Sequence, residues 1–215
     1  MNVTAVIMAG GKGSRFDYDK VSDLQSKEKL LLKLGEKHII EFVIDALLKT
    51  KRITRIILAV SPYTPKTRAL VEAHYKSIQI FETPGKDYHE DLQFVIKSLN
   101  LRTTLLINGD IPLITSLILD EIIEKYNESG KPSLTVMAQN SKFIKNMTTP
   151  TVIFHSIDDQ ESLVPLGINI IDGRYIDEEK IDQTTLVSEK KELFYNINTY
   201  EDFLKLSEFC NKHDK

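Results

Sequence analysis

The stretch Met8-Ala9-Gly10-Gly11-Lys12-Gly13-Ser14-Arg15-Phe16 directly follows an apolar run that begins at Val3. The run predicts a buried strand, and the three glycines predict a tight turn at its end. Glycines let backbone N–H groups approach an anion closely, and Lys12 and Arg15 place positive charge beside it. The stretch therefore predicts a strand and turn that cradle the phosphates of a nucleotide.

The spelling of this turn excludes two common phosphate-binding motifs. A Walker A loop needs a glycine five residues before Gly11, where Val6 stands. The Rossmann fingerprint needs a third glycine at the position of Phe16. The alternative to a phosphate cradle is a flexible glycine turn with surface cations.

Composition indicates an ordinary enzyme-sized domain. The 215 residues, 41% of them hydrophobic, suit one α/β domain over 1–215, and the net charge of −3 offers no basic footprint for nucleic acid. No apolar run approaches the roughly 18 residues of a membrane span, and no signal peptide is evident. The single cysteine, Cys210, fits a reducing compartment, so we expect a cytoplasmic protein.

Short apolar runs alternate with amphipathic segments along the chain. Helical spacing is seen over 40–48, 92–99 and 118–126, the last after a cap at Thr115 or Ser116, and a final helix begins at the capping-box sequence from Thr199. This alternation predicts right-handed crossovers and a three-layer α/β fold, a mainly parallel twisted sheet with helices on both faces. The predicted strands are Val3–Ala9, Arg55–Val60, Ser77–Phe81, Thr103–Ile107, Ser133–Ala138, Thr151–His155 and Gly167–Ile171.

Ligands bind at the carboxyl ends of the strands in an open parallel sheet. The glycine turn and the tracts Ser61–Thr67, Thr83–Lys86 and Asn108–Asp110 each follow a predicted strand. We therefore expect them to surround one cleft. The polar segment Asp17–Glu28 is predicted to be a mobile loop beside the glycine turn.

Two tracts offer oxygen ligands for a cation. Asp110 ends an apolar strand, and a carboxylate there can hold Mg²⁺, which usually shares its ligands with phosphates. Asn198 precedes the last helix and can add a neutral oxygen. The alternatives are a turn cap for Asp110 and a helix cap for Asn198.

Lys29 stands just before the apolar run that starts at Leu30. A lysine entering a buried segment is poorly placed for mere solubility, so it is a candidate for contact with phosphate. The alternative is an ordinary solvated lysine, like Lys27 or Lys33.

In chain order, Ala9–Phe16, Glu28-Lys29, Gly109-Asp110 and Asn196–Thr199 resemble the MobA-like nucleotidyltransferase superfamily. Two departures concern the lysine. Leu30 stands where that superfamily usually has proline, and the spacer from Arg15 is long, which keeps Lys27 as the alternative to Lys29.

Three further tracts, Ser61–Thr67, Gly85–Leu92 and Leu163–Asn169, are similar to the archaeal adenosylcobinamide-phosphate guanylyltransferases. That family transfers GMP from GTP to a corrinoid phosphate and releases pyrophosphate, a step of cobalamin biosynthesis. The resemblance implies GTP as donor, a corrinoid phosphate as acceptor and Mg²⁺ as cofactor.

The resemblance also implies a role for each candidate residue. Arg15 and Lys29 would be catalytic, and Asp110 and Asn198 would hold Mg²⁺. The acceptor would meet Pro165, Gly167 and Asn169. The nucleotide would meet Ala9, Gly10, Gly11, Lys12, Gly13, Ser14, Ser61, Thr83, Gly85, Glu90 and Asp91.

Within that set, Glu90 and Asp91 are the candidates for reading guanine. A carboxylate can accept from guanine N1–H and N2–H₂, as can backbone groups of Ser61 and Thr83. The alternative for both acidic residues is a favourable charge in the first turn of a helix.

Other functions stay open at this point. A molybdenum-cofactor guanylyltransferase has the same chemistry with a pterin acceptor, although the lack of tryptophan argues against a flat stacking slot. A sugar-phosphate nucleotidyltransferase and a non-catalytic nucleotide-binding subunit are further alternatives. The residues leave the oligomeric state undecided, with a homodimer as one alternative.

Overall fold

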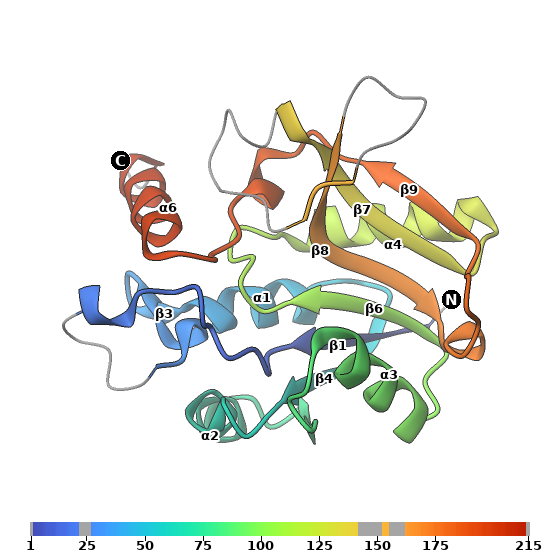
Figure 1. The fold of residues 1–215 in the computed structure, drawn as a ribbon, viewed down its shortest axis with the longest axis horizontal. Helices are drawn as coiled ribbons and strands as arrows, with labels where there is room; N and C mark the ends of the chain where they lie inside the picture. Colours follow the sequence, from blue (N-terminus) through green and yellow to red (C-terminus); the bar gives the residue numbers. More distant parts are fainter. Residues whose placement is uncertain (1, 22–26, 142–151, 155–161, 214–215) are drawn as a thin grey trace.

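The computed structural model describes residues 2–21, 27–141, 152–154 and 162–213. A sheet of seven strands runs through the molecule in the order β5-β4-β1-β6-β8-β7-β9 (Figure 1). All neighbouring strands are parallel except at β8, which is antiparallel to both β6 and β7. The strands are β1 (Val3–Met8), β4 (Ile53–Val60), β5 (Gln79–Glu82), β6 (Thr103–Asn108), β7 (Ser133–Gln139), β8 (Leu163–Asp172) and β9 (Gln183–Val187).

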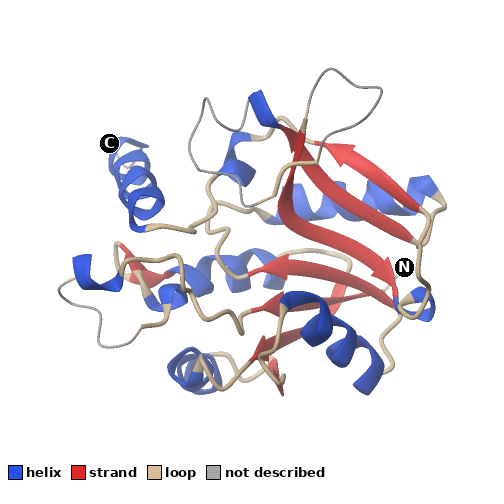
Figure 2. Cartoon of the chain, viewed as in Figure 1, coloured by secondary structure: helices blue, strands red, loops and turns tan. Residues whose placement is uncertain are grey.

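Helices cover both faces of the sheet, as predicted (Figure 2). One face packs against α1 (Ile39–Leu48), α2 (Pro65–His74) and α4 (Ser116–Ser129) in the larger apolar core. The other face packs against α3 (Tyr88–Ser98), which covers β4, β1 and β6 in a smaller core. The C-terminal helix α6 (Tyr200–His213) lies beyond the carboxyl ends of the central parallel strands (Figure 1). No helix in the described ranges is both long and apolar enough to cross a bilayer.

The predicted caps of two helices are confirmed. The Ile118 N–H donates to the Thr115 hydroxyl at 3.3 Å, so Thr115 rather than Ser116 caps α4. Thr199 and Asp202 form the predicted capping box of α6, with bonds of 2.8 and 3.2 Å in the two directions. These short-range signals work because the bonding partners are three residues apart in the sequence.

The strand predictions are confirmed in six places with small shifts of their ends. The run Gly167–Ile171 is only the second half of β8, which begins at Leu163 and continues through Pro165. A parallel strand reached by a right-handed crossover was expected here. Instead, β8 runs antiparallel to its neighbour β7, which precedes it in the chain. The predicted strand Thr151–His155 is not a strand in its described part, residues 152–154, where Phe154 forms an isolated bridge to Leu163.

Three elements were missed, and each has a physical reason. Helix α2 buries only Thr67 and Val71, so it has no apolar stripe. Strand β9 lies at the sheet edge, begins with three polar residues and has no fully buried residue, so it leaves no apolar run. The hairpin of β2 (Lys33–Leu34) and β3 (Lys37–His38) is too short to leave a periodic pattern.

Candidate active site

An ion pair between Lys29 and Asp110 lies at the centre of the candidate site. The Lys29 ammonium contacts Asp110 Oδ2 and also donates to the Ile197 carbonyl at 2.7 Å. The Ile197 N–H donates in turn to the Asp110 carbonyl at 3.1 Å. Three segments far apart in the sequence therefore meet at the end of β6. This geometry favours Lys29 as the candidate catalytic lysine over Lys27, which is exposed.

A second pair of charged and amide groups joins the two ends of the chain. The Arg15 guanidinium donates to Asn198 Oδ1 at 3.0 Å. The Asn198 N–H is held by the Asp202 carboxylate at 3.0 Å, so the capping box of α6 also orients Asn198. The predicted catalytic cations, Arg15 and Lys29, thus each contact one of the predicted metal ligands.

Two buried polar atoms at this centre lack a hydrogen-bond partner among the atoms that the structure describes. They are Asp110 Oδ1 and Asn198 Nδ2, and both residues are only 7% exposed. A buried polar group left unpaired costs about 1–3 kcal/mol, so such atoms call for a ligand. The unpaired Asp110 Oδ1 fits Mg²⁺, which needs few protein ligands when phosphates supply others. Asn198 Nδ2 is a donor and suits a phosphate oxygen, whereas Asn198 Oδ1 could bind the cation once Arg15 turns to the phosphate.

Close packing, rather than ligand contact, explains Gly109. A Cβ at this position would lie 3.0 Å from methyl groups of Leu30 and Ile40. The absence of a side chain lets the segment from Lys29 pack tightly under the end of β6. Gly109 thereby allows Leu30, the residue after Lys29, to lie close to the end of β6.

The glycine turn is shaped by Tyr18. Gly13 has a φ of +63°, and a Cβ there would lie 2.0 Å from the Tyr18 hydroxyl. That hydroxyl is buried and is also unpaired within the described ranges. Burial raises the pKa of the Tyr18 phenol, so it stays protonated and can donate to an anion at the turn.

The predicted nucleotide tracts from three strand ends do come together. The Ser61 hydroxyl, after β4, donates to the Gly10 carbonyl at 2.7 Å. A Cβ on Gly10 or on Gly85 would lie 3.0 Å from the Ser61 Cβ, so both glycines permit close approach. Lys12 lies over the Tyr63 ring, 4.6 Å from its centroid. Within the glycine turn, Ala9 is buried, whereas Gly11 and Ser14 are exposed.

The two acidic guanine candidates occupy very different places. Asp91 is 6% exposed, and its oxygens accept from the Thr83 hydroxyl and the Gly85 N–H, both at 3.0 Å. Asp91 therefore supports the turn after β5 from within, which differs from the direct contact predicted for it. Glu90 is exposed and pairs with Lys86 at 3.0 Å.

The predicted acceptor residues lie on one face of β8. Pro165, Gly167 and Asn169 alternate with buried apolar residues and are each half-buried. Their face is the one on which α3 lies, and among the described helices none covers β8, β7 or β9 there. Asn169 lines a hollow of about 330 Å³ whose wall includes Tyr88, Gln93 and Gln183. Gly167 has a φ of +70°, and a Cβ at this position would clash with the Asn108 side chain.

Tyr88 connects the predicted nucleotide tracts with the predicted acceptor residues, and it was not among the predicted site residues. It begins α3, and its hydroxyl bonds to Asn169. Burial of the hydroxyl, opposed by the Asn169 bond and reinforced by the Asp110 charge, raises the pKa of Tyr88 to about 12. A tyrosine next to the Gly85-Lys86 turn was the available signal, but nothing local indicates contact with a strand 81 residues away.

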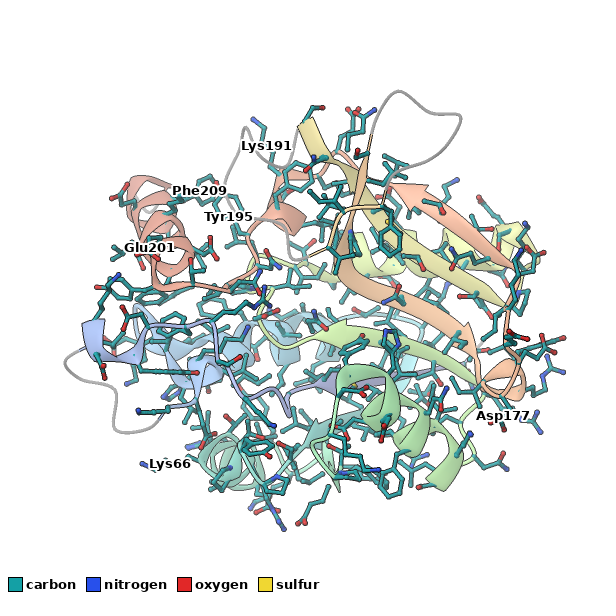
Figure 3. The ribbon with its side chains drawn as sticks, in the orientation of Figure 1. Lys66, Asp177, Lys191, Tyr195, Glu201 and Phe209 are labelled. Atoms are coloured by element: carbon teal, nitrogen blue, oxygen red, sulfur yellow. The ribbon has the colours of Figure 1, made fainter. Side chains whose placement is uncertain are left out.

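The C-terminal helix and the segment before it complete the site. Tyr195 and Phe209 pack with ring centroids 4.7 Å apart, and Glu201 at the start of α6 accepts from Lys20 at 2.9 Å (Figure 3). The stretch Asp17–Val21 is therefore attached to α6. Glu28, at the other end of the predicted mobile loop, is buried. The intervening residues 22–26 lie outside the described ranges.

With this geometry established, residues 5–173 match the MobA-like NTP transferase domain. The chain belongs to that family. It is 33% identical to the adenosylcobinamide-phosphate guanylyltransferase of Methanocaldococcus jannaschii, over 98% of each chain. It is 27% identical to the probable molybdenum cofactor guanylyltransferase of Thermococcus gammatolerans, over 93% of this chain and 96% of that one.

A solved structure supports the fold. The 4-diphosphocytidyl-2C-methyl-D-erythritol synthase of Anaerococcus prevotii superposes with a TM-score of 0.67 at 14% identity, covering 98% of this chain and 96% of that chain. The three-layer α/β prediction is confirmed, and the protein is a nucleotidyltransferase.

Proposed function

We propose that this protein transfers GMP from GTP to adenosylcobinamide phosphate and releases pyrophosphate. The observation that carries the proposal is the convergence of two cations, Arg15 and Lys29, on two oxygen-bearing side chains, Asp110 and Asn198. In the structure Lys29 neutralises the Asp110 carboxylate, and Arg15 donates to the neutral amide oxygen of Asn198. A triphosphate offers the cations better partners, because it carries several negative charges in one place.

The reaction joins one oxygen to phosphorus and separates another. An oxygen of the acceptor phosphate attacks the α-phosphorus of GTP, a new P–O–P bond forms, and the bond to the bridging oxygen of pyrophosphate breaks. A phosphate monoester has a second pKa near 6, so the attacking oxygen is already ionised at neutral pH. No general base is needed, in keeping with the scattered histidines.

The protein's task is to offset the charge of two polyanions. Arg15 and Lys29 would contact the α-phosphate, where negative charge develops on the equatorial oxygens. Lys12, Gly13 and the protonated Tyr18 hydroxyl would hold the β- and γ-phosphates. Asp110 and Asn198 would hold Mg²⁺, which would supply further charge neutralisation at the phosphates when bound.

The nucleoside end of GTP is assigned to the junction of the tracts at Ser61, Thr83 and Gly85. Asp91 keeps the Thr83–Gly85 turn in shape, so its effect on guanine would be exerted through the backbone of that turn. Glu90 is solvent-exposed next to the same turn and keeps its predicted role as the direct acceptor from guanine. These groups would make the site prefer guanine over other bases.

The acceptor is assigned to the uncovered face of β8. A corrinoid is broad and carries amide side chains, so it suits a wide surface with neutral polar groups such as Asn169 and Gln183. The similarity to the Methanocaldococcus protein supports the corrinoid. The molybdenum-cofactor relatives keep a pterin as the second candidate, because they match nearly the whole chain at lower identity.

The proposal is tested by incubating the protein with GTP, Mg²⁺ and adenosylcobinamide phosphate and analysing the products by mass spectrometry. We expect guanylylated corrinoid and pyrophosphate in equal amounts. Adenosylcobinamide without its phosphate is the control and should not react. Failure of the corrinoid phosphate to react, with guanylylation of molybdopterin instead, would contradict the proposal and favour the second candidate.

A further inference from the structure

Glu28 is a buried carboxylate that the reaction described above does not use. Its residue is 6% exposed. One oxygen accepts from the Lys66 N–H at 3.0 Å, and the other accepts from the Thr67 N–H and hydroxyl, both at 2.7 Å. The partners belong to the first turn of α2, 38 residues further along the chain. Figure 3 shows Lys66 beside α2.

Glu28 completes the hydrogen bonding of this helix end. A helix leaves its first N–H groups without intrahelical partners, and a side chain at the N-cap normally accepts from one of them. Thr64, the N-cap residue of α2, makes no such bond, and Pro65 has no N–H to donate. The next two N–H groups, those of Lys66 and Thr67, both donate to Glu28. The negative charge also suits the positive end of the helix dipole.

The residue after Glu28 is Lys29, whose ammonium contacts Asp110 and the Ile197 carbonyl. Glu28 and Lys29 are adjacent in the chain but contact two different parts of the site. Glu28 attaches the chain to the segment Ser61–Thr67, whose Ser61 contacts the glycine turn. Lys29 attaches it to the end of β6. The position of the Lys29 backbone therefore depends on the bonds of Glu28 to α2.

We propose that Glu28 is a positioning residue that holds Lys29 in place for nucleotidyl transfer and couples it to the nucleotide-binding segment at the start of α2. Both oxygens of Glu28 accept from the start of α2, so it acts through Lys29 and not on the substrate. The proposal rests on the nucleotidyl-transfer reaction assigned above and is independent of which acceptor is used.

The test is the variant Glu28→Gln, which keeps the size of the side chain but places an amide donor against backbone N–H donors. Misplacing Lys29 should lower kcat by about 10- to 100-fold. The KM for GTP should change by less than about threefold, because ground-state contacts to GTP remain. The control Asp172→Asn alters another buried carboxylate, which accepts from the Arg174 N–H at 3.1 Å and lies beside the start of β6, at the opposite end of that strand from Asp110. This control should leave kcat unchanged.

A double variant distinguishes positioning from general damage. If Glu28 acts through Lys29, Glu28→Gln should lower kcat by less than about twofold when introduced into Lys29→Ala. An equal loss in both backgrounds would overturn the proposal, as would an unchanged kcat or an effect on the KM for GTP alone. If Glu28→Gln does not fold, Thr67→Val removes one of the three bonds and should show a smaller loss of kcat; no loss would overturn the proposal.

Wild-type turnover separates this inference from the proposed function. If the wild type does not guanylylate the corrinoid, the proposed acceptor is wrong. The Glu28 comparison is then made with the acceptor that the wild type does guanylylate.

Discussion

Replacing Asp110 with asparagine removes one negative charge from the centre of the site without changing the size of the side chain. The carboxylate contacts Lys29 through Oδ2 and leaves Oδ1 unpaired and buried. A hydrogen bond to a charged group is worth about 1.5–3 kcal/mol. Once Lys29 binds the α-phosphate, the contact to the proposed Mg²⁺ is the one lost, which amounts to about 1.5–3 kcal/mol, or roughly one to two powers of ten in kcat.

The assay is pyrophosphate release at saturating GTP and acceptor over a range of Mg²⁺ concentrations. Asp120→Asn is the matched control, because Asp120 is a surface carboxylate on α4 that accepts from the Lys51 N–H at 3.1 Å. It should behave as the wild type. Urea unfolding should show a loss of only about 1–2 kcal/mol for Asp110→Asn, since the amide oxygen still accepts from Lys29. Turnover within threefold of the wild type at every Mg²⁺ concentration would refute the reasoning.

Three further outcomes are expected. Lys29→Ala should lower kcat by at least about 100-fold, whereas Lys27→Ala should have almost no effect; the reverse order in steady-state kinetics would return the assignment to Lys27. Arg15→Ala should lower kcat more than GTP affinity, and Asn198→Ala should cost less than Asp110→Asn, as kinetics and calorimetry together would reveal. Calorimetric titration should give GTP at least about 30-fold tighter binding than ATP, about 2 kcal/mol, and equal affinities would remove the guanine assignment.

Sequence reasoning succeeded where the signal was local. The glycine turn after β1, the strand ends and the capping box of α6 each depend on residues within a few positions of one another. The rule that ligands bind at the carboxyl ends of parallel strands then placed distant tracts in one region. The contacts of Lys29 and Arg15 with Asp110 and Asn198 agree with that placement.

The features that were missed depend on contacts between distant segments. Nothing near Glu28 in the sequence indicates that it accepts from the start of α2. That helix was itself not predicted, because it has no apolar stripe. Asp91 was a candidate for guanine because a carboxylate can accept from guanine N–H groups, yet it is buried and accepts from the Thr83 hydroxyl and the Gly85 N–H. The reversed direction of β8 is set by its pairing with β6 and β7, which a short apolar run does not encode. The cytoplasmic location and a homodimer stay predictions.

Acceptor choice is the central claim, and a direct competition tests it. The protein is given limiting GTP with Mg²⁺ and equal concentrations of adenosylcobinamide phosphate and molybdopterin, and both guanylylated products are counted by mass spectrometry. The account predicts guanylylated corrinoid in large excess, because the face of β8 that no described helix covers offers Asn169 and Gln183 to the amide side chains of a corrinoid. An excess of guanylylated pterin would contradict it.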